Sequence, residues 1–271
     1  MNNIKSVLFS LSLIVAMATG CTKPENNGDT NENKLSKREH SMLTVLWQQN
    51  SAEYKALCYQ AYNIASNKLR SLDMNSERPL AIITDVDETV LDNSPYNAMQ
   101  IEKDLDFNKK DWIDWGKQKS AKALPGAVEF FNLADSLGIE VFYISNRYNV
   151  QLEETIANLK DLNFPMADSS HVFLKTTTSE KQERRDIVLE NHEVVLYMGD
   201  NLSDFSQIFD NQSTASRNKS ADEMYASFGD KFIVFPNPMY GDWESKGIYE
   251  NSRSWTDEQK DSIRRAKLIS Y

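Results

Sequence analysis

Five short apolar runs that alternate with segments of helical periodicity constrain the fold of this chain more than any other feature. Each run is rich in β-branched or aromatic side chains and is bounded by polar residues, which is typical of a buried strand. Buried strands that alternate with helices predict an α/β fold, a doubly wound parallel sheet with helices on both faces. The expected strands are residues 80–84, 139–145, 171–175, 193–199 and 231–236. The expected helices are residues 127–137, 151–162 and 179–190, preceded by one or two helices within 38–72.

Residues 92–123 do not follow this alternation, because they are rich in polar and aromatic side chains. They predict a small helical insertion, or cap, between the first strand and the helix that returns from it. We expect residues 38–271 to form one domain that carries this insertion at about 92–123.

The first 37 residues are typical of an export signal followed by a tether. A short apolar stretch follows Lys5, which predicts a secretory signal peptide over residues 1–20. The small residues before Cys21 resemble the lipobox of bacterial lipoproteins and predict lipid attachment at Cys21, with secretion without lipid as the alternative. Residues 21–37 are polar and almost free of apolar side chains, so they predict a flexible tether.

Charge and hydropathy exclude several classes of partner. The chain has 30 Lys and Arg against 40 Asp and Glu, a net charge of −10. Binding of a nucleic-acid polymer needs a basic face, so we expect none. No apolar run after the first twenty residues is long enough to span a bilayer, so we expect membrane contact only through the N-terminal lipid. Two cysteines cannot build a disulfide scaffold, and Cys58 lies in an apolar helical stripe that predicts an inert core thiol.

Polar clusters lie at the carboxyl ends of four expected strands or just beyond them. Because ligands of parallel sheets bind at this edge, we expect the clusters to face one crevice. The clusters are Asp85-Val86-Asp87-Glu88-Thr89, Ser145-Asn146-Arg147, Ser179-Glu180-Lys181 and Gly199-Asp200-Asn201-Leu202-Ser203-Asp204.

The residue types in these clusters favour one chemistry. Several carboxylates at one site need a cation, and oxygen donors favour Mg²⁺. The three histidines, His40, His171 and His192, fall outside the clusters, which disfavours zinc. A metal-bound carboxylate that faces a lysine and a hydroxyl suits phosphoryl transfer. Neither G-x-x-x-x-G-K-[ST] nor G-x-S-x-G occurs, so a P-loop ATPase and a serine esterase are not supported.

The ordered set of motifs resembles the four motifs of the haloacid-dehalogenase (HAD) superfamily of phosphatases. From about residue 40 to the C-terminus the chain is similar to class C bacterial acid phosphatases, the lipoprotein e family of outer-membrane 5′-nucleotidases. The resemblance implies a HAD-like fold and a phosphomonoesterase anchored by lipid in the outer membrane, on its periplasmic or surface face. The runs that carry it are DVDETVLDNSPY, W-x-x-W at Trp112 and Trp115, LPGAVEF, ISNR, S-x-K-x-x-R at 179–184, LYMGDNLSDF and FPNPMYGDWE.

The resemblance implies roles for individual residues. Asp85 would be the nucleophile that forms an aspartyl-phosphate. Asp87 would protonate the leaving alkoxide and then activate water, and the i, i+2 spacing suits this because alternate side chains of an extended segment share a face. Ser145 and the amide of Asn146 would hold the phosphoryl oxygens. Lys181 would balance charge at the helix N-terminus, with Lys175 as its rival.

The resemblance also implies the metal ligands. Mg²⁺ would be held by Asp85, by the main-chain carbonyl of Asp87 and by Asp200. Asp204 would bind either the metal or a water in its shell. Arg147 would contact phosphate or pair with an acid, and pairing is the reading we favour.

Aromatic residues are the predicted leaving-group site. The resemblance implies that Trp112 and Tyr240 sandwich a nucleobase, while Trp115 either joins them or is buried in the cap. Stacking on the faces of a base does not read the hydrogen-bonding groups on its edges, so we expect broad use of nucleoside monophosphates and related phosphomonoesters. The resemblance also suggests a homodimer. Two alternative functions stay open, namely a surface lipoprotein that mainly binds a ligand such as haem, and a phosphotransferase that uses the same site.

Overall fold

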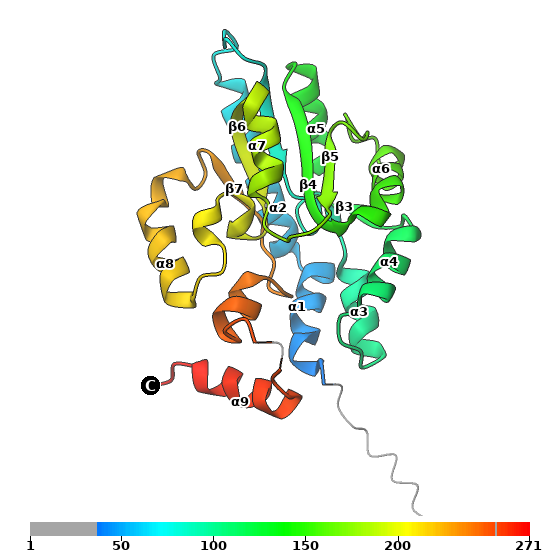
Figure 1. Ribbon diagram of the computed structural model, residues 1–271, viewed down its shortest axis with the longest axis vertical. Helices are drawn as coiled ribbons and strands as arrows, with labels where there is room; N and C mark the ends of the chain where they lie inside the picture. The colour runs from blue at the N-terminus through cyan, green and yellow to red at the C-terminus, as the bar shows by residue number, and fades with distance from the viewer. Residues whose placement is uncertain (1–36, 253) are drawn as a thin grey trace, which may run out of the picture. The chain divides into compact units, whose positions relative to one another are not determined.

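A five-stranded parallel sheet lies at the centre of the computed structural model, which describes residues 37–252 and 254–271 (Figure 1). Its strand order is β5-β4-β1-β6-β7, and all four strand pairings are parallel. The predicted α/β fold with a parallel sheet is therefore confirmed. The strands are β1 (Leu80–Thr84), β4 (Glu140–Tyr148), β5 (Val172–Lys175), β6 (Glu193–Gly199) and β7 (Phe232–Val234).

Three predictions fall outside the residues that the structure describes. They are the signal peptide over residues 1–20, the lipidated Cys21 and the tether, of which only Lys37 is described. In the described part of the chain, no helix combines the length and the apolar character that crossing a bilayer needs.

Helices cover both faces of the sheet. Successive strand residues point to opposite sides, and the strands are apolar on both sides, so both faces need a covering layer. Ile82 of β1 belongs to one core cluster together with side chains from α2, α5 and α6, while Ile83 belongs to a second cluster with Val188 of α7. Cys58 is fully buried in the first cluster, and burial raises its pKa to about 11, as expected of a core thiol. These helices are α2 (Ala52–Arg70), α5 (Ala127–Ser136), α6 (Leu152–Asp161) and α7 (Gln182–Asn191).

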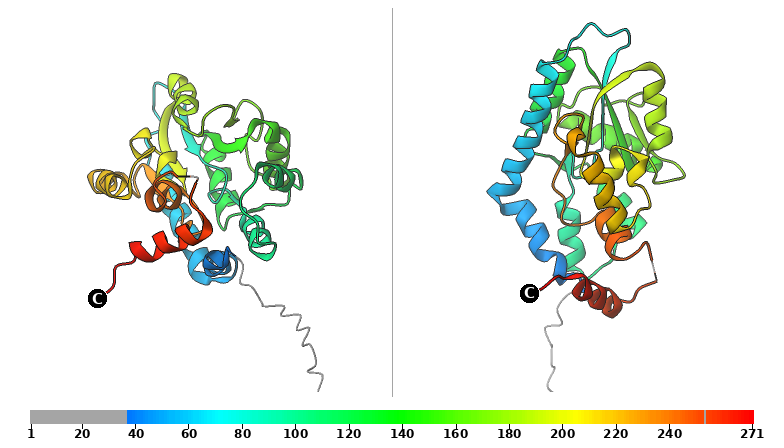
Figure 2. Two further views of the ribbon diagram at one scale, coloured as in Figure 1. Left: turned by 60° about the horizontal axis from the view of Figure 1, so that its bottom comes forward. Right: turned by 90° about the vertical axis from the view of Figure 1, so that its left-hand side faces the viewer.

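A small helical insertion separates β1 from α5. Two short strands, β2 (Leu91–Asp92) and β3 (Lys122–Ala123), pair antiparallel at its base. Between them lie α3 (Ser94–Glu102) and α4 (Lys109–Lys117). Helix α1 (Glu39–Asn50) packs against α3, and both lie on the side of the sheet where the strands end (Figures 1 and 2).

The remaining elements carry little apolar periodicity, which is why the sequence did not predict them. The charged helices α8 and α9 are examples, since α9 has no buried residue and α8 buries only Arg217. The full set of these remaining elements is η1 (Asn149–Gln151), η2 (Leu202–Asp204), η3 (Gln207–Phe209), α8 (Thr214–Glu223), η4 (Tyr225–Ser227), the π-helix η5 (Trp243–Ile248) and α9 (Asp257–Lys267).

Candidate active site

The polar clusters that follow the strands meet at one edge of the sheet. Asp85 directly follows β1, and its amide donates a hydrogen bond to the carbonyl of Met198 in the neighbouring β6 at 2.8 Å. This bond holds the loop after β1 beside the end of β6, after which Asp200 begins the next loop. Lys181 approaches from the N-cap of α7.

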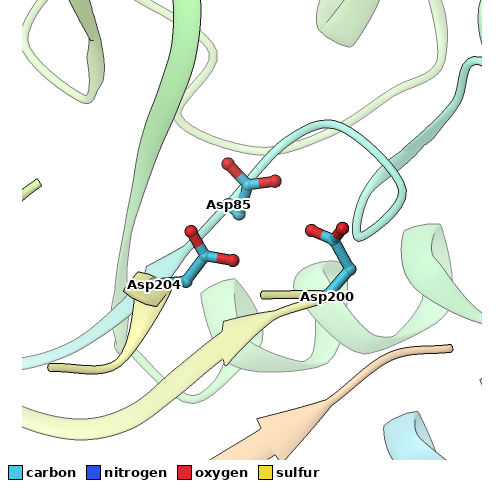
Figure 3. Close-up of side chains that lie close together, drawn as sticks. All are labelled: Asp85, Asp200 and Asp204. Carbon is cyan, nitrogen blue, oxygen red and sulfur yellow. The ribbon is translucent and has the colours of Figure 1, made fainter. Parts of the chain in front are cut away.

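Three aspartates form a compact cluster there. One carboxylate oxygen from each of Asp85, Asp200 and Asp204 lies within 4.8 Å of the other two, and Figure 3 shows the carboxylates facing a common space. Lys181 donates to Asp85 and, at 2.7 Å, to Asp204. The lysine is 4% exposed, so the ion pairs are shielded from water. Three acids surround one lysine, which leaves this cluster short of positive charge.

The pKa shifts follow from this imbalance. Burial raises the pKa of Asp85 to about 7; Lys181 opposes the rise, while Asp204 and Asp87 add to it. Enclosure by protein likewise raises the pKa of Asp200 well above its usual value, with Asp204 and Asp85 adding to the rise. For Lys181, burial opposes the charged form, but Asp204 and Asp85 outweigh it and raise the pKa. Oxygen donors with surplus negative charge fit a hard divalent cation.

A close backbone approach sets the position of Asp204. This residue ends η2, and its Oδ2 accepts a hydrogen bond from the amide of Asn201 at 3.0 Å. A Cβ atom on Gly199 would lie 2.4 Å from Asp204 Oδ2. Arg185, fully buried, donates to the carbonyl of Asp204 at 3.0 Å. The glycine thus leaves room for the acid, and the arginine fixes its backbone.

Asp87 has quite different surroundings from Asp85. Its Oδ1 accepts from Arg147 Nε and from Asn93 Nδ2, both at 2.8 Å. Its Oδ2 accepts from Ser145 Oγ at 3.0 Å. Arg147 is 2% exposed and pairs with this acid, which is the reading that the sequence favoured. Three donors therefore fix both carboxylate oxygens of Asp87.

The insertion supplies the support for this network. Asn93 Oδ1 accepts from Trp115 Nε1 at 2.8 Å and from Arg147 at 3.3 Å. Trp115 is partly buried and packs against the main core. The guanidinium carbon of Arg147 lies 5.8 Å from the ring centre of Trp112, a cation–π contact. The insertion thus supports Asn93 and Arg147, two of the three residues that donate to Asp87.

The segment from Asn237 to Tyr240 lies across two of the loops. Asn237 Nδ2 donates to Asp200 Oδ2 at 2.8 Å, and the Tyr240 hydroxyl donates to Glu88. Glu88 is fully buried and has a left-handed backbone (φ 58°), and burial raises its pKa well above its usual value. The sequence predicted no role for Asn237 or Glu88, although they lie within the motifs FPNPMYGDWE and DVDETVLDNSPY.

The predicted phosphate contacts lie beside the aspartates. Asn146 is exposed at the end of β4, and its Oδ1 accepts from Arg184 at 2.8 Å. Arg184 also donates to the carbonyl of Ser145 at 2.6 Å, a role that the S-x-K-x-x-R pattern could have signalled. Lys175 lies 4.2 Å from the ring centre of Tyr148, whereas Lys181 contacts Asp85.

The two residues of the predicted aromatic clamp contact different parts of the site, Trp112 the guanidinium of Arg147 and Tyr240 the carboxylate of Glu88. Trp112 is 9% exposed and packs edge-on against Tyr96, with ring centres 5.0 Å apart. Tyr240 is half-buried and bonded to Glu88. Among the ring contacts of the described residues, none joins Trp112 to Tyr240. The clamp therefore stays a prediction.

A cavity of about 600 Å³ adjoins the site. Its wall includes Asn146 and Ser179, as well as Phe107 of the insertion and Tyr249 near the C-terminus. The aspartate cluster is not part of this wall. Cavities of this size hold small organic ligands, so the space can accept a group larger than phosphate.

This chain is similar in sequence and fold to several acid phosphatases. The sequence profile described as HAD superfamily, subfamily IIIB (acid phosphatase), matches residues 12–243. The class C acid phosphatase from Bacillus anthracis is 41% identical, with a TM-score of 0.83 that covers 87% of this chain and 99% of that one. Its structure with tungstate bound is 42% identical, with a TM-score of 0.83 and coverage of 86% and 98%. Acid phosphatase 1 from Solanum lycopersicum is 28% identical over 198 residues, 69% of each chain.

Proposed function

We propose a metal, a substrate class and a cellular location for this chain, which belongs to the acid phosphatases of subfamily IIIB in the HAD superfamily. It is a phosphoric monoester hydrolase, and its predicted resemblance to class C acid phosphatases is confirmed. The reaction that we propose is Mg²⁺-dependent hydrolysis of nucleoside monophosphates and related phosphomonoesters. The observation that carries this proposal is the meeting of Asp85, Asp200 and Asp204 around Lys181.

Asp85 is the proposed nucleophile. One of its carboxylate oxygens attacks phosphorus, the bond between phosphorus and the ester oxygen breaks, and an aspartyl-phosphate forms. Lys181 supports this step because it already donates to Asp85 and can neutralise charge on the phosphoryl group. The amide of the exposed Asn146 is a proposed donor to the remaining phosphoryl oxygens, and the hydroxyl of Ser145 would donate to them by turning from Asp87 when substrate binds.

Asp87 is the proposed acid and base. It gives a proton to the departing alkoxide and afterwards takes a proton from the water that attacks the aspartyl-phosphate, which releases inorganic phosphate and restores Asp85. The bonds from Arg147, Asn93 and Ser145 support this role, because they hold the carboxyl group in one orientation. Such fixed geometry lowers the reorganisation that each proton transfer requires.

Mg²⁺ is the proposed cofactor. Side-chain oxygens of Asp85, Asp200 and, directly or through water, Asp204 would hold it, together with the carbonyl of Asp87. When bound, the cation would neutralise the surplus negative charge and favour the approach of an anionic substrate. Asn237 donates to one oxygen of Asp200, which leaves the other oxygen available as a ligand.

Nucleoside monophosphates are the proposed substrates. Tungstate is a tetrahedral oxyanion like phosphate, and its presence in the related Bacillus anthracis structure supports an oxyanion site in this fold. Trp112 and Tyr240 are the proposed contacts for the base, whereas the cavity of about 600 Å³ is lined by other residues.

A panel of nucleoside and simple phosphomonoesters, assayed with Mg²⁺ and with EDTA, tests the proposal. We expect phosphate release with Mg²⁺, loss of release with EDTA, and recovery when Mg²⁺ is restored. Asp85→Asn should abolish release, whereas a pure ligand-binding function would persist in that variant. Equal turnover in EDTA would refute the metal proposal. An added alcohol that captures the phosphoryl group would reveal the phosphotransferase alternative.

An exported lipoprotein anchored in the outer membrane is the proposed location. The proposal rests on the signal pattern over residues 1–20, the lipobox at Cys21 and the polar tether over 21–37. Labelling of cells with a fatty-acid analogue should mark the wild type but not Cys21→Ser. Label in both proteins, or in neither, would contradict lipid attachment at Cys21. Light scattering of the purified protein would test the proposed homodimer.

A further inference from the structure

A second cluster of ligand-type side chains lies at the opposite edge of the sheet. Glu140 is the first residue of β4, His171 directly precedes β5, and His192 directly precedes β6. Two of the three histidines of the chain thus meet one carboxylate. The proposed reaction uses none of these residues, because they lie where the strands begin rather than where they end.

Both imidazole rings present the same nitrogen to Glu140. His171 Nε2 lies 3.5 Å and His192 Nε2 lies 3.3 Å from Glu140 Oε2. The ring of Phe142 packs against both imidazoles, with centre-to-centre distances of 5.1 Å and 4.9 Å. Phe142 therefore sets the positions of the two rings on either side of the carboxylate.

The other ring nitrogens are committed as donors. His192 Nδ1 lies 3.1 Å from the carbonyl of Val188, and His171 Nδ1 lies 2.9 Å from the carboxylate of Asp168. Carbonyls and carboxylates only accept, so each Nδ1 carries the hydrogen. Burial opposes the charge on Asp168, but hydrogen bonds from Ser170 and His171 outweigh it and hold the pKa of Asp168 at about 2.

This arrangement leaves an electrostatic conflict in the neutral state. With hydrogen fixed on Nδ1, a neutral ring turns the lone pair of Nε2 towards Glu140, which is itself an acceptor. A proton on each ring or a shared cation resolves the conflict. Carboxylates and carbonyls that fix Nδ1–H are also the usual support of histidines that bind metal through Nε2.

We propose that His171, His192 and Glu140 bind a divalent transition metal such as Zn²⁺, separate from the Mg²⁺ proposed for the active site. Tetrahedral sites with bonds of about 2.0–2.2 Å place neighbouring ligand atoms about 3.3–3.5 Å apart, which matches both observed nitrogen–oxygen distances. A water would be the fourth ligand. All three side chains are partly exposed, at 19%, 15% and 37%, so an ion can reach them.

Metal binding requires the two rings to move closer together. Within the described part of the chain, only the three active-site aspartates already have ligand atoms that all lie within 4.8 Å of one another. His171 and His192 stand just outside the ends of strands, where small adjustments cost less than inside the sheet. A bound ion would tie the starts of β4, β5 and β6 together and stabilise the native state.

Titration of the full, untagged chain with Zn²⁺ and with Co²⁺, in saturating Mg²⁺, tests this proposal. We expect one Zn²⁺ equivalent, a rise in melting temperature and the intense visible absorption of four-coordinate Co²⁺. His171→Gln, His192→Gln and Glu140→Gln should each weaken binding at least about tenfold, and Asp168→Asn by about tenfold through loss of its bond to His171. His40→Gln, which alters the remaining histidine, is the matched control and should bind like the wild type.

Phosphatase activity in Mg²⁺ verifies that each variant is folded, since these residues are remote from the reaction. Equal binding by the wild type and the His171→Gln/His192→Gln double variant would overturn the proposal. Failure of the wild type to bind either metal, with the rings taking up protons instead, would overturn it too.

Discussion

Asp85 and Asp87 lie two residues apart on one loop, yet their neighbouring groups differ in charge and in hydrogen bonding. Asp85 lies among other acids with Lys181 as its cation, and burial raises its pKa to about 7. Asp87 is held through both oxygens by Arg147, Asn93 and Ser145. Asp85 thus lies in a cluster with surplus negative charge, whereas Asp87 has a paired charge and a donor to each of its oxygens.

The difference matches two different chemical tasks. A nucleophilic carboxylate needs its negative charge to be balanced when a phosphate ester binds. The net charge around it should therefore depend on whether Mg²⁺ is bound. A proton carrier needs a constant orientation through both half-reactions. The same loop can serve both tasks because Asp85 lies beside groups from α7 and η2, whereas Asp87 lies beside groups from β4 and the insertion.

The largest effect should come from Asp85, the proposed nucleophile. Asp85→Asn should lower kcat by about four orders of magnitude or more, because no covalent intermediate can form. Asp87→Asn should lower kcat by about two to four orders of magnitude, because only proton transfer is lost. Steady-state assays with one phosphomonoester compare the two. A larger loss in Asp87→Asn would reverse the assignment of roles.

The next largest effect should come from Arg147. Arg147→Met leaves Asp87 without its ion pair and should lower kcat about 100-fold, while Arg147→Lys, which keeps the charge, should lose less. Melting curves serve as the control, because removal of one partner from a buried pair can cost about 3–5 kcal/mol. Full activity in a folded Arg147→Met protein would show that geometry around Asp87 is unimportant.

Asn237 offers a test of the charged half of the site. Asn237→Ala removes the donor to Asp200 and should weaken Mg²⁺ affinity by about 10- to 100-fold, with kcat at saturating Mg²⁺ little changed. Activity as a function of free Mg²⁺ gives both quantities. A fall in kcat with unchanged Mg²⁺ affinity would contradict a supporting role for this residue.

Stability without metal should depend on pH through Asp85. Its pKa is about 7 in the folded state against about 3.9 unfolded, so the folded state holds more protons between these values. Stability in EDTA should therefore fall as the pH rises from 4 towards 7, by the linkage relation. Melting temperatures in EDTA measure this fall, and Mg²⁺ or Asp85→Asn should lessen it, while Asp200 and Glu88, whose pKa values are also raised, keep part of the slope. A melting temperature that rises over this range would contradict the charge imbalance.

The smallest effect should come from Trp115. Trp115→Phe keeps the packing but removes the donor to Asn93, so it should cost about 1 kcal/mol of stability. We expect kcat to fall less than about tenfold, because Asn93 keeps its bond to Asp87. A loss as large as that of Arg147→Met would mean that the network acts as one unit.

The sheet and its strand-end clusters could be predicted because apolar β-branched runs are a strong local signal. The run over 80–84 coincides with β1, and that over 193–199 with β6. Since parallel strands end at one edge, the convergence of Asp85 with Asp200 followed from topology. Helices α8 and α9 could not be predicted, because they bury no apolar stripe and so lack the periodic pattern that indicates a helix.

The supporting contacts could not be predicted, because they join residues far apart in the sequence without any periodic pattern. Asn237 is 37 residues from Asp200, and Tyr240 is 152 residues from Glu88. Sequence reasoning could favour Lys181 over Lys175 only by its motif, whereas the structure separates them by their contacts. Helix α7 begins at Gln182 rather than at Ser179, so Lys181 occupies its N-cap.

Asn93 connects the insertion with the reaction centre, since it follows β2, accepts from Trp115 and donates to Asp87. An insertion exchanged with that of another phosphatase would keep the support of Asp87 only if it supplied an amide and an indole at these two places. The insertion and the proposed acid and base are therefore expected to evolve jointly rather than as separate modules.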